Sequence, residues 1–333
     1  MARLLARILM VCAAATLTGV LVPAGAAHAR SPIRVGVGDQ NLAMFISPAF
    51  RPLNIRRTRY FVAENVMQDS AERRKARAFV EAARAAGVST LLHISTADLR
   101  SRRGALVSMD RYRRDVGRIV DYFRKLGVTD FGSWNEVNHT TQETWDHPGH
   151  AASYFKSMYR AVKQGEGPPV ACPDCAVVGL DVLDQAGVDG YIRRFYEERR
   201  PTWRKRLTIV GSHNYADVNR NRSTGTSSII RTVHRYNPGA GFWFTETGAL
   251  ASFRGSFPFS LTRQAARMPN MFRLASRFRS SGVSRVYTYN WFGVETDTRC
   301  GRTCEFDAGL VNPLGSPRPV YDVFRRHLRD YSR

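Results

Sequence analysis

The chain has 333 residues, long enough for one large hydrophobic core, and 43% of them are hydrophobic. Its formal charge is +22 at pH 7, because 50 Lys and Arg residues oppose 28 Asp and Glu residues. Nearly all the basic residues are Arg, and they are dispersed over every helix-like segment rather than gathered into one stripe. This dispersal argues against nucleic-acid binding and favours a solvated basic surface, while an acidic cell-wall glycan stays open as a partner.

The first 29 residues are typical of a secretory signal peptide. Arg3 and Arg7 precede an apolar run that ends in the small-x-small sequence AHA at 27–29, so we expect cleavage after Ala29. Thr, Gly and Pro interrupt the run, which argues against a membrane anchor, and no later segment is apolar for long enough to span a bilayer. We therefore expect a secreted, monomeric mature chain, 30–333, that is free of the membrane and whose charge falls to +20 with the two arginines.

Strand-like and helix-like segments alternate along the mature chain. Short apolar runs typical of strands lie at 33–38, 58–64, 89–95, 129–136, 176–182, 207–215, 242–248 and 284–293. Amphipathic segments typical of helices lie at 70–87, 110–127, 150–164, 191–200, 227–236, 271–282 and 321–331. Strands that are each followed by a helix predict a single-domain (β/α)8 TIM barrel over 30–333. A doubly wound sheet is the alternative, but no GxGxxG phosphate turn follows the first strand.

Four cysteines remain in the mature chain, in two close pairs. Cys172 and Cys175 lie in CPDC, and Cys300 and Cys304 lie in CGRTC. Secreted proteins meet oxidising conditions, so we expect two short local disulfides. A four-cysteine zinc site is an alternative that the spacing permits, and a redox role for CPDC is a further one.

Two similar stretches place a glutamate at the end of an apolar run. Glu136 lies in FGSWNEVNHT (131–140), and Glu246 lies in GFWFTETGAL (241–250). A carboxylate at a buried strand end costs free energy unless it is paired, hydrated or used. Each glutamate could simply pair with one of the many arginines. In the predicted barrel, however, both would end strands on the face where active sites are built.

Two carboxyl groups on that face suit the cleavage of a glycosidic bond. A protonated one donates to the glycosidic oxygen, while an ionised one attacks the anomeric carbon. We expect mutual repulsion and partial burial to separate their pKa values and so to assign these roles. Retention of configuration predicts carboxyl groups about 5–5.5 Å apart, and inversion predicts about 6.5–9.5 Å.

The sequence resembles the clan A glycoside hydrolases, the superfamily that contains families 5 and 39, along most of the mature chain. The strand 4 motif W-N-E-x-N of the clan is matched by Trp134, Asn135, Glu136 and Asn138. Its strand 7 motif, apolar-T-E-x-G, is matched at 244–248. The resemblance implies that Glu136 is the acid/base, that Asn135 holds the sugar 2-hydroxyl and that Glu246 is the nucleophile. A departure is Val137, where the clan often has proline.

Further matches extend the resemblance to other strands. His213 and Tyr215 match the His-x-Tyr of strand 6, which implies that the tyrosine hydrogen-bonds the nucleophile. Trp291 resembles the aromatic floor on which the reacting sugar stacks, and Arg59 resembles the strand 2 arginine that supports the nucleophile. The ending GLVNPLGSPRPVYDVF also resembles the closing segment of such enzymes. Structural alternatives stay open, because His213 could be a core histidine and Trp291 a packing residue.

Several other polar residues are candidates for the lining of the cleft. His93 and Asp39 could line it, although nothing in the sequence separates them from structural polar residues. The loop after strand 4 contains His139, Asp146, His147 and His150, with Trp145 as a possible sugar platform. Their spacing fits no zinc pattern, and the chemistry proposed for the two glutamates needs neither a metal nor a cofactor.

The sequence therefore predicts a secreted retaining glycoside hydrolase acting on a carbohydrate. Transglycosylation, in which an acceptor sugar replaces water, is an alternative, and so is a non-catalytic basic protein that binds cell-wall polysaccharide. Sugar, linkage and endo or exo cleavage depend on loops such as 294–307, which one sequence does not disclose.

Overall fold

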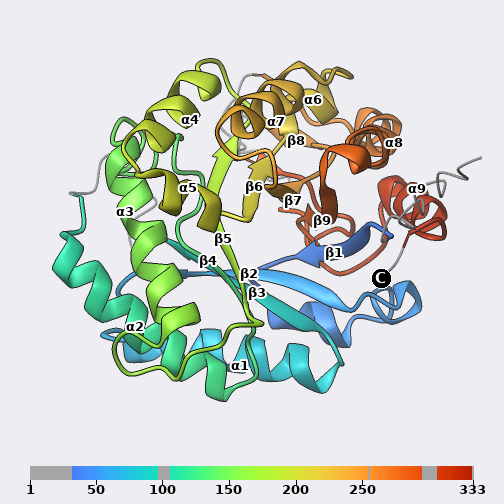
Figure 1. The fold of residues 1–333 in the computed structure, drawn as a ribbon. Coiled ribbons are helices and arrows are strands. Elements are labelled where there is room, and N and C mark those ends of the chain that lie inside the picture. Colours follow the sequence, from blue (N-terminus) through green and yellow to red (C-terminus); the bar gives the residue numbers. More distant parts are fainter. Residues whose placement is uncertain (1–31, 97–105, 254–255, 295–305, 332–333) are drawn as a thin grey trace, which may run out of the picture. The chain divides into compact units, whose positions relative to one another are not determined.

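The computed structural model describes residues 32–96, 106–253, 256–294 and 306–331. Eight parallel strands close into a barrel in the order β1-β2-β3-β4-β5-β6-β7-β9 (Figure 1). These strands are β1 Arg34–Gly38, β2 Arg57–Ala63, β3 Ser89–Ser95, β4 Asp130–Gly132, β5 Ala176–Leu183, β6 Ile209–His213, β7 Gly241–Thr247 and β9 Val283–Tyr289. Contacts gather Pro32–Arg333 into one compact unit. The predicted (β/α)8 barrel is confirmed.

Helices surround the barrel (Figure 1). They are α1 Ser70–Ala85, α2 Met109–Lys125, α3 Pro148–Tyr159, α4 Val188–Glu197, α5 Pro201–Arg206, α6 Tyr215–Asn219, α7 Thr224–Tyr236, α8 Leu261–Arg277 and α9 Pro319–Leu328. Shorter turns are η1 Leu42–Ile46, η2 Arg51–Leu53, η3 Arg160–Gln164 and η4 Arg279–Ser281. Amphipathic sequences explain this layer, because each long helix turns an apolar stripe towards the strands. None of these helices is long and apolar enough to cross a membrane.

A small antiparallel sheet lies outside the barrel, between β8 Ser252–Phe253 and β10 Phe306–Asp307. It joins the loop after β7 to the loop after β9. Because the loops at the carboxyl ends of barrel strands form the active-site face, this sheet belongs to that face.

The barrel interior changes from apolar to polar along its axis. Leu91, Val178, Trp243 and Tyr287, from four strands, form a compact buried cluster. Gly36 on β1 makes room for it, because a Cβ there would overlap the Tyr287 ring. Buried ionisable side chains from β2, β3, β5, β6 and β7 contact one another in a separate group.

The structure corrects the extent of the fourth strand. We expected it over 129–136, but the regular strand ends at Gly132. Beyond that point the backbone bonds alternately to both neighbours, with Ser133 N to Val178 O at 2.9 Å and Asn135 N to Ile94 O at 2.8 Å. The segment therefore stays bound between β3 and β5 although it leaves the regular ladder. The expected signal peptide at 1–29 lies outside the described residues.

Candidate active site

Glu246 is held on β7 by two donors, one on each carboxylate oxygen. Arg59 Nη1 donates to Oε2 at 2.7 Å, and the Tyr215 hydroxyl donates to Oε1 at 3.0 Å. Arg59 is only 1% exposed and also donates through Nη2 to Asn135. Buried charge-assisted hydrogen bonds of this kind fix the orientation of the carboxylate.

Glu136 lies in the loop that follows β4, in an uncommon backbone conformation. Its φ is 43°, in the left-handed region that non-glycine residues rarely adopt. Hydrogen bonds on both sides hold it there, because Asn135 N donates to Ile94 O and Val137 N donates to Asp181 O at 2.9 Å. A strained residue that its neighbours hold in place is typical of functional sites. Its side chain is 18% exposed and faces a cavity.

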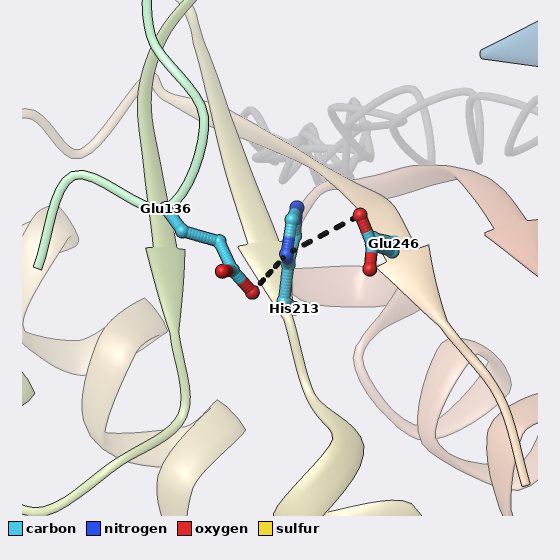
Figure 2. A group of neighbouring side chains, drawn as sticks. All are labelled: Glu136, His213 and Glu246. Atoms are coloured by element: carbon cyan, nitrogen blue, oxygen red, sulfur yellow. Dashed lines mark hydrogen bonds and ion pairs between the residues drawn. The ribbon is translucent and has the colours of Figure 1, made fainter. Parts of the chain in front are cut away.

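His213, the last residue of β6, lies between the two glutamates (Figure 2). Its Nδ1 atom lies 2.9 Å from Glu136 Oε1 and 3.8 Å from Glu246 Oε2. One carboxylate oxygen of each glutamate and one imidazole nitrogen all lie within 4.8 Å of one another. The nearest carboxylate oxygens of the two glutamates are therefore closer than the roughly 6.5–9.5 Å that separates the carboxyl groups of an inverting pair.

The other nitrogen of His213 contacts a buried acid. Nε2 lies 3.0 Å from Asp181 Oδ2, and Asp181 has no exposed side-chain surface. Burial alone would lower the pKa of His213, but Asp181, Glu246 and Glu136 outweigh it and raise that pKa to about 10. The imidazole is thus protonated at neutral pH.

This imidazolium changes where the acid proton is expected to lie. Burial would raise the pKa of Glu136, but the hydrogen bond and the charge of His213, together with His139, outweigh burial and lower that pKa below its ordinary value. We expected burial and mutual repulsion to separate the two glutamates. Instead, protonated His213 lies between them, and the proton of the His213–Glu136 pair is held on the imidazole. The sequence did not predict this position of His213.

A second buried histidine, His93 on β3, behaves in the opposite way. His93 Nδ1 accepts from Arg59 Nε at 3.4 Å, and its Nε2 lies 3.6 Å from Asp181 Oδ2. Burial lowers the pKa of His93 to about 3, in spite of Asp181. His93 is therefore a neutral structural partner of Arg59.

The glutamates and His213 have the spacing of a three-ligand metal site, but their chemistry does not suit one. A metal ligand needs a free nitrogen lone pair, which a protonated imidazole lacks. Both nitrogens of His213 face carboxylates, and Arg59 places a further positive charge on Glu246. These residues suit a bound proton better than a divalent cation.

Both glutamates open into a cavity of about 750 Å³, a size typical of small-molecule sites. It is lined by the ends of several strands and by the β8–β10 sheet. Asn135 and Tyr215 line it with the glutamates, and Tyr289 contributes an aromatic ring.

Three of the predicted substrate-binding residues lie elsewhere. Trp134 is fully buried and donates from Nε1 to Gln142 at 3.0 Å. Asn138 bridges to the Leu183 backbone through both its amide atoms, at 3.0 and 2.8 Å. Trp291 has no exposed surface and packs edge-on against Phe50. A fully buried indole offers no face to a sugar, so the platform assigned to Trp291 is corrected to a packing role.

Two residues that the sequence reasoning missed are well placed. Tyr289, two residues before Trp291, lines the cavity at the end of β9. Asp181 is the one acid in the apolar run AVVGLDVL, and such a buried charge was the signal that could have identified it.

Asp39 accepts from the backbone N–H groups of Trp291 and Phe292, at 2.9 and 3.0 Å, and thereby fixes the loop after β9.

The remaining sequence candidates have local roles. His139 lines the cavity and contacts Glu136 Oε2 at 3.9 Å, whereas His147 pairs with Asp146 at 3.1 Å and His150 contacts Val107 O at 2.9 Å. Trp145 is half-buried and does not line the cavity.

One expected disulfide is present. Cys172 and Cys175 are joined, with their Cα atoms 5.3 Å apart, so this pair is not half of a four-thiolate zinc site. Cys300 and Cys304 lie outside the described residues, as does most of the 294–307 loop.

The fold and the site define a (β/α)8 barrel with paired glutamates at the carboxyl ends of its fourth and seventh strands. No protein-family model matches the sequence, and no curated protein matches it. Among solved structures, fungal β-1,4-galactanases are similar at a TM-score of 0.63 and 14% identity, over 89% of this chain and 100% of theirs.

Two further solved structures have the same fold. A GH5_18 protein from Bifidobacterium longum subsp. infantis has a TM-score of 0.59 and 13% identity, over 91% of this chain and 80% of its own. Xylanase 10B from Thermotoga maritima has a TM-score of 0.57 and 16% identity, over 90% of this chain and 95% of its own. The resemblance to clan A glycoside hydrolases is thus confirmed at the level of the fold.

Proposed function

We propose that this protein is a retaining glycoside hydrolase that is secreted after cleavage of its signal peptide and works as a monomer. The proposal rests on one observation: Glu136 and Glu246 line the same cavity, and one carboxylate oxygen of Glu136 lies within 4.8 Å of one of Glu246. This spacing supports double displacement, in which a carboxylate attacks the sugar directly. The similar solved glycosidases support the same reaction class.

Glu246 is the nucleophile in this proposal. Arg59 and Tyr215 bind its two oxygens and keep it oriented towards the cavity. In the first step Glu246 forms a bond to the anomeric carbon as the glycosidic C–O bond breaks. In the second step water displaces Glu246, and the product keeps the original configuration.

Glu136 is the acid and then the base. It donates a proton to the leaving oxygen in the first step and takes one from water in the second. The 2.9 Å contact between His213 Nδ1 and Glu136 Oε1 gives the proton a direct path from the imidazolium to the carboxylate. His213 would therefore supply the proton that Glu136 passes on.

Release of reducing sugar from a broad polysaccharide panel tests the proposal. The mature protein is compared with its Glu136→Gln and Glu246→Gln variants, and we expect release by the parent alone. Product configuration, followed by NMR during the first turnovers, should show retention. A Glu246→Gln variant with normal activity would overturn the assignment. The protein could instead bind acidic polymers in a salt-sensitive way, without hydrolysing them and without any effect of either substitution. That result would indicate a binding protein.

A further inference from the structure

The cavity continues from the glutamates along a wall of aromatic side chains. Tyr215, which donates to Glu246, meets Phe306 edge-on with 5.2 Å between ring centroids. Phe306 contacts Phe253 across the β8–β10 sheet, with 6.2 Å between centroids. Phe253 then pairs with Phe257 through a backbone hydrogen bond of 2.9 Å. All four rings line the cavity, so they form one surface leading away from the nucleophile.

A guanidinium lies at the far end of this wall. Arg220, which follows α6, also lines the cavity, and its Cζ atom lies 5.4 Å from the centre of the Phe257 ring. Arg263 contacts the same ring at 5.3 Å. A guanidinium placed on a ring face is held by the ring quadrupole while its N–H groups stay free for a ligand.

The charges around Arg220 leave it without a neutralising partner. Within the described residues Arg220 forms no ion pair, whereas Arg222, which also lines the cavity, pairs with Asp217 at 3.1 Å. Asp184, which also lines the cavity, accepts from the backbone N–H groups of Ala216 and Asp217 at 3.0 and 2.7 Å. Burial and Asp217 raise the pKa of Asp184 to about 8, so it carries little negative charge at neutral pH.

We propose that the substrate is an acidic glycan, and that Arg220 binds an anionic group on a sugar beyond the reacting one. The aromatic wall would pack against the apolar faces of the intervening sugar, and the guanidinium would bind carboxylate or sulfate oxygens by paired N–H donors. This inference rests on the proposed glycosidase function for the position of the scissile bond. The high positive charge of the chain would add long-range attraction for such a polymer.

The test compares Arg220→Gln with a matched loss of charge elsewhere. Arg231, exposed on α7 and outside the cavity lining, provides the control variant Arg231→Gln. The probes are uronate-containing glycans (glucuronoxylan, polygalacturonate, alginate), sulfated glycans (chondroitin sulfate, carrageenan) and neutral ones (arabinoxylan, mixed-linkage β-glucan, galactomannan). The uronate and sulfate arms distinguish the two sources of anionic oxygen.

We expect an acidic glycan to be the best substrate. Arg220→Gln should raise its KM about fivefold or more, with kcat little changed, because the contact is remote from the reacting bond. Arg231→Gln should leave KM unchanged, and Arg220→Lys should restore part of the affinity. A neutral glycan as best substrate, or equal effects of the two Gln variants, would overturn the proposal.

Binding to the Glu246→Gln variant separates this proposal from the proposed function. Acidic glycans that bind this variant, and bind it more weakly after Arg220→Gln, would uphold the anionic subsite even if the parent hydrolyses nothing. In that case the proposed hydrolase function would be wrong, and the proposed anionic subsite would be correct. The subsite would be refuted if acidic glycans did not bind, or if their affinity did not change after Arg220→Gln. This holds whether or not the parent protein hydrolyses glycans.

Discussion

Asp181 Oδ2 lies 3.0 Å from His213 Nε2, and the opposite nitrogen of that imidazole lies 2.9 Å from Glu136 Oε1. Asp181 has no exposed surface and does not line the cavity. It therefore acts on Glu136 through His213, as a positioning residue. The cations around Asp181, with His213 first, overcome its burial and hold its pKa well below the ordinary range.

Asp181→Asn should shift the pH dependence of the enzyme. Asp181 is the leading group that raises the pKa of His213 to about 10, so its loss should lower that pKa. The proton that His213 supplies is present below this pKa and is lost as the pH rises through it. We expect the alkaline limb of kcat/KM to move down by about one to three pH units.

Profiles of kcat/KM between pH 5 and 11 would measure this shift, with circular dichroism as a check on folding. Asp189→Asn, an exposed substitution on α4, is the matched control. An alkaline limb that stays in place in Asp181→Asn would contradict the role assigned to Asp181.

Gly211→Ala tests the same relationship without removing an ionisable group. Gly211 lies beside Asp181 in the β5–β6 register, and a Cβ there would overlap the Asp181 carboxylate and crowd Thr245 Oγ1. Overpacking should cost about 1–3 kcal/mol of stability and displace Asp181 from His213. Denaturant unfolding measures the first effect, and a downward shift of the alkaline limb measures the second. A destabilised variant with the parent pH profile would show that the exact position of Asp181 is unimportant.

Azide should distinguish the roles of the two glutamates. With an aryl glycoside whose leaving group departs without protonation, Glu136→Ala still forms the bond to Glu246, and azide can attack the bound sugar because it needs no general base. The glycosyl azide formed should retain configuration. In Glu246→Ala, azide would occupy the vacated space and displace the leaving group directly, which inverts configuration. NMR of the two products checks this, and an exchange of the two outcomes would reverse the assignments.

Tyr215→Phe should lower kcat by about 10- to 100-fold, because the free energy of one hydrogen bond to a charged group corresponds to a rate factor of this size. The hydroxyl that is lost donates to Glu246 Oε1 at 3.0 Å, and the ring that remains still packs against Phe306. Steady-state kinetics measure the change. Tyr289→Phe serves as the control, because it removes a hydroxyl from the same cavity without a hydrogen bond to Glu246. Equal losses in both variants would argue against a specific role for the Tyr215 hydroxyl.

We expect Tyr289 to bind the substrate and Trp291 to pack in the core. Tyr289→Ala removes a ring from the cavity wall and should raise KM, whereas Trp291→Ala empties a buried site and should cost about 3–5 kcal/mol of stability. Kinetics and denaturant unfolding of both variants provide the comparison. A Trp291→Phe variant that is stable yet binds substrate poorly would restore the tryptophan as a sugar platform.

Local patterns were enough to predict the architecture and the carboxylate pair. The alternation of short apolar runs with amphipathic segments depends on neighbours in sequence, so the barrel and most strand positions followed from it. Glu136 and Glu246 were found because a charge that ends an apolar run is visible in sequence. The fourth strand was predicted too long because backbone bonds to β3 and β5 continue where the regular ladder stops.

The sequence by itself determined the barrel, its order of strands and the two glutamates placed at strand ends. Only the tertiary structure decided which side chains face one another across the barrel. It placed His213 between the glutamates, Asp181 behind it, and Tyr289 rather than Trp291 in the cavity. The physical reason is that the charge state of a buried group depends on partners from other strands. The β5–β6 register pairs Asp181 with Gly211, two residues before His213, and the folded side chains then place Asp181 Oδ2 3.0 Å from His213 Nε2.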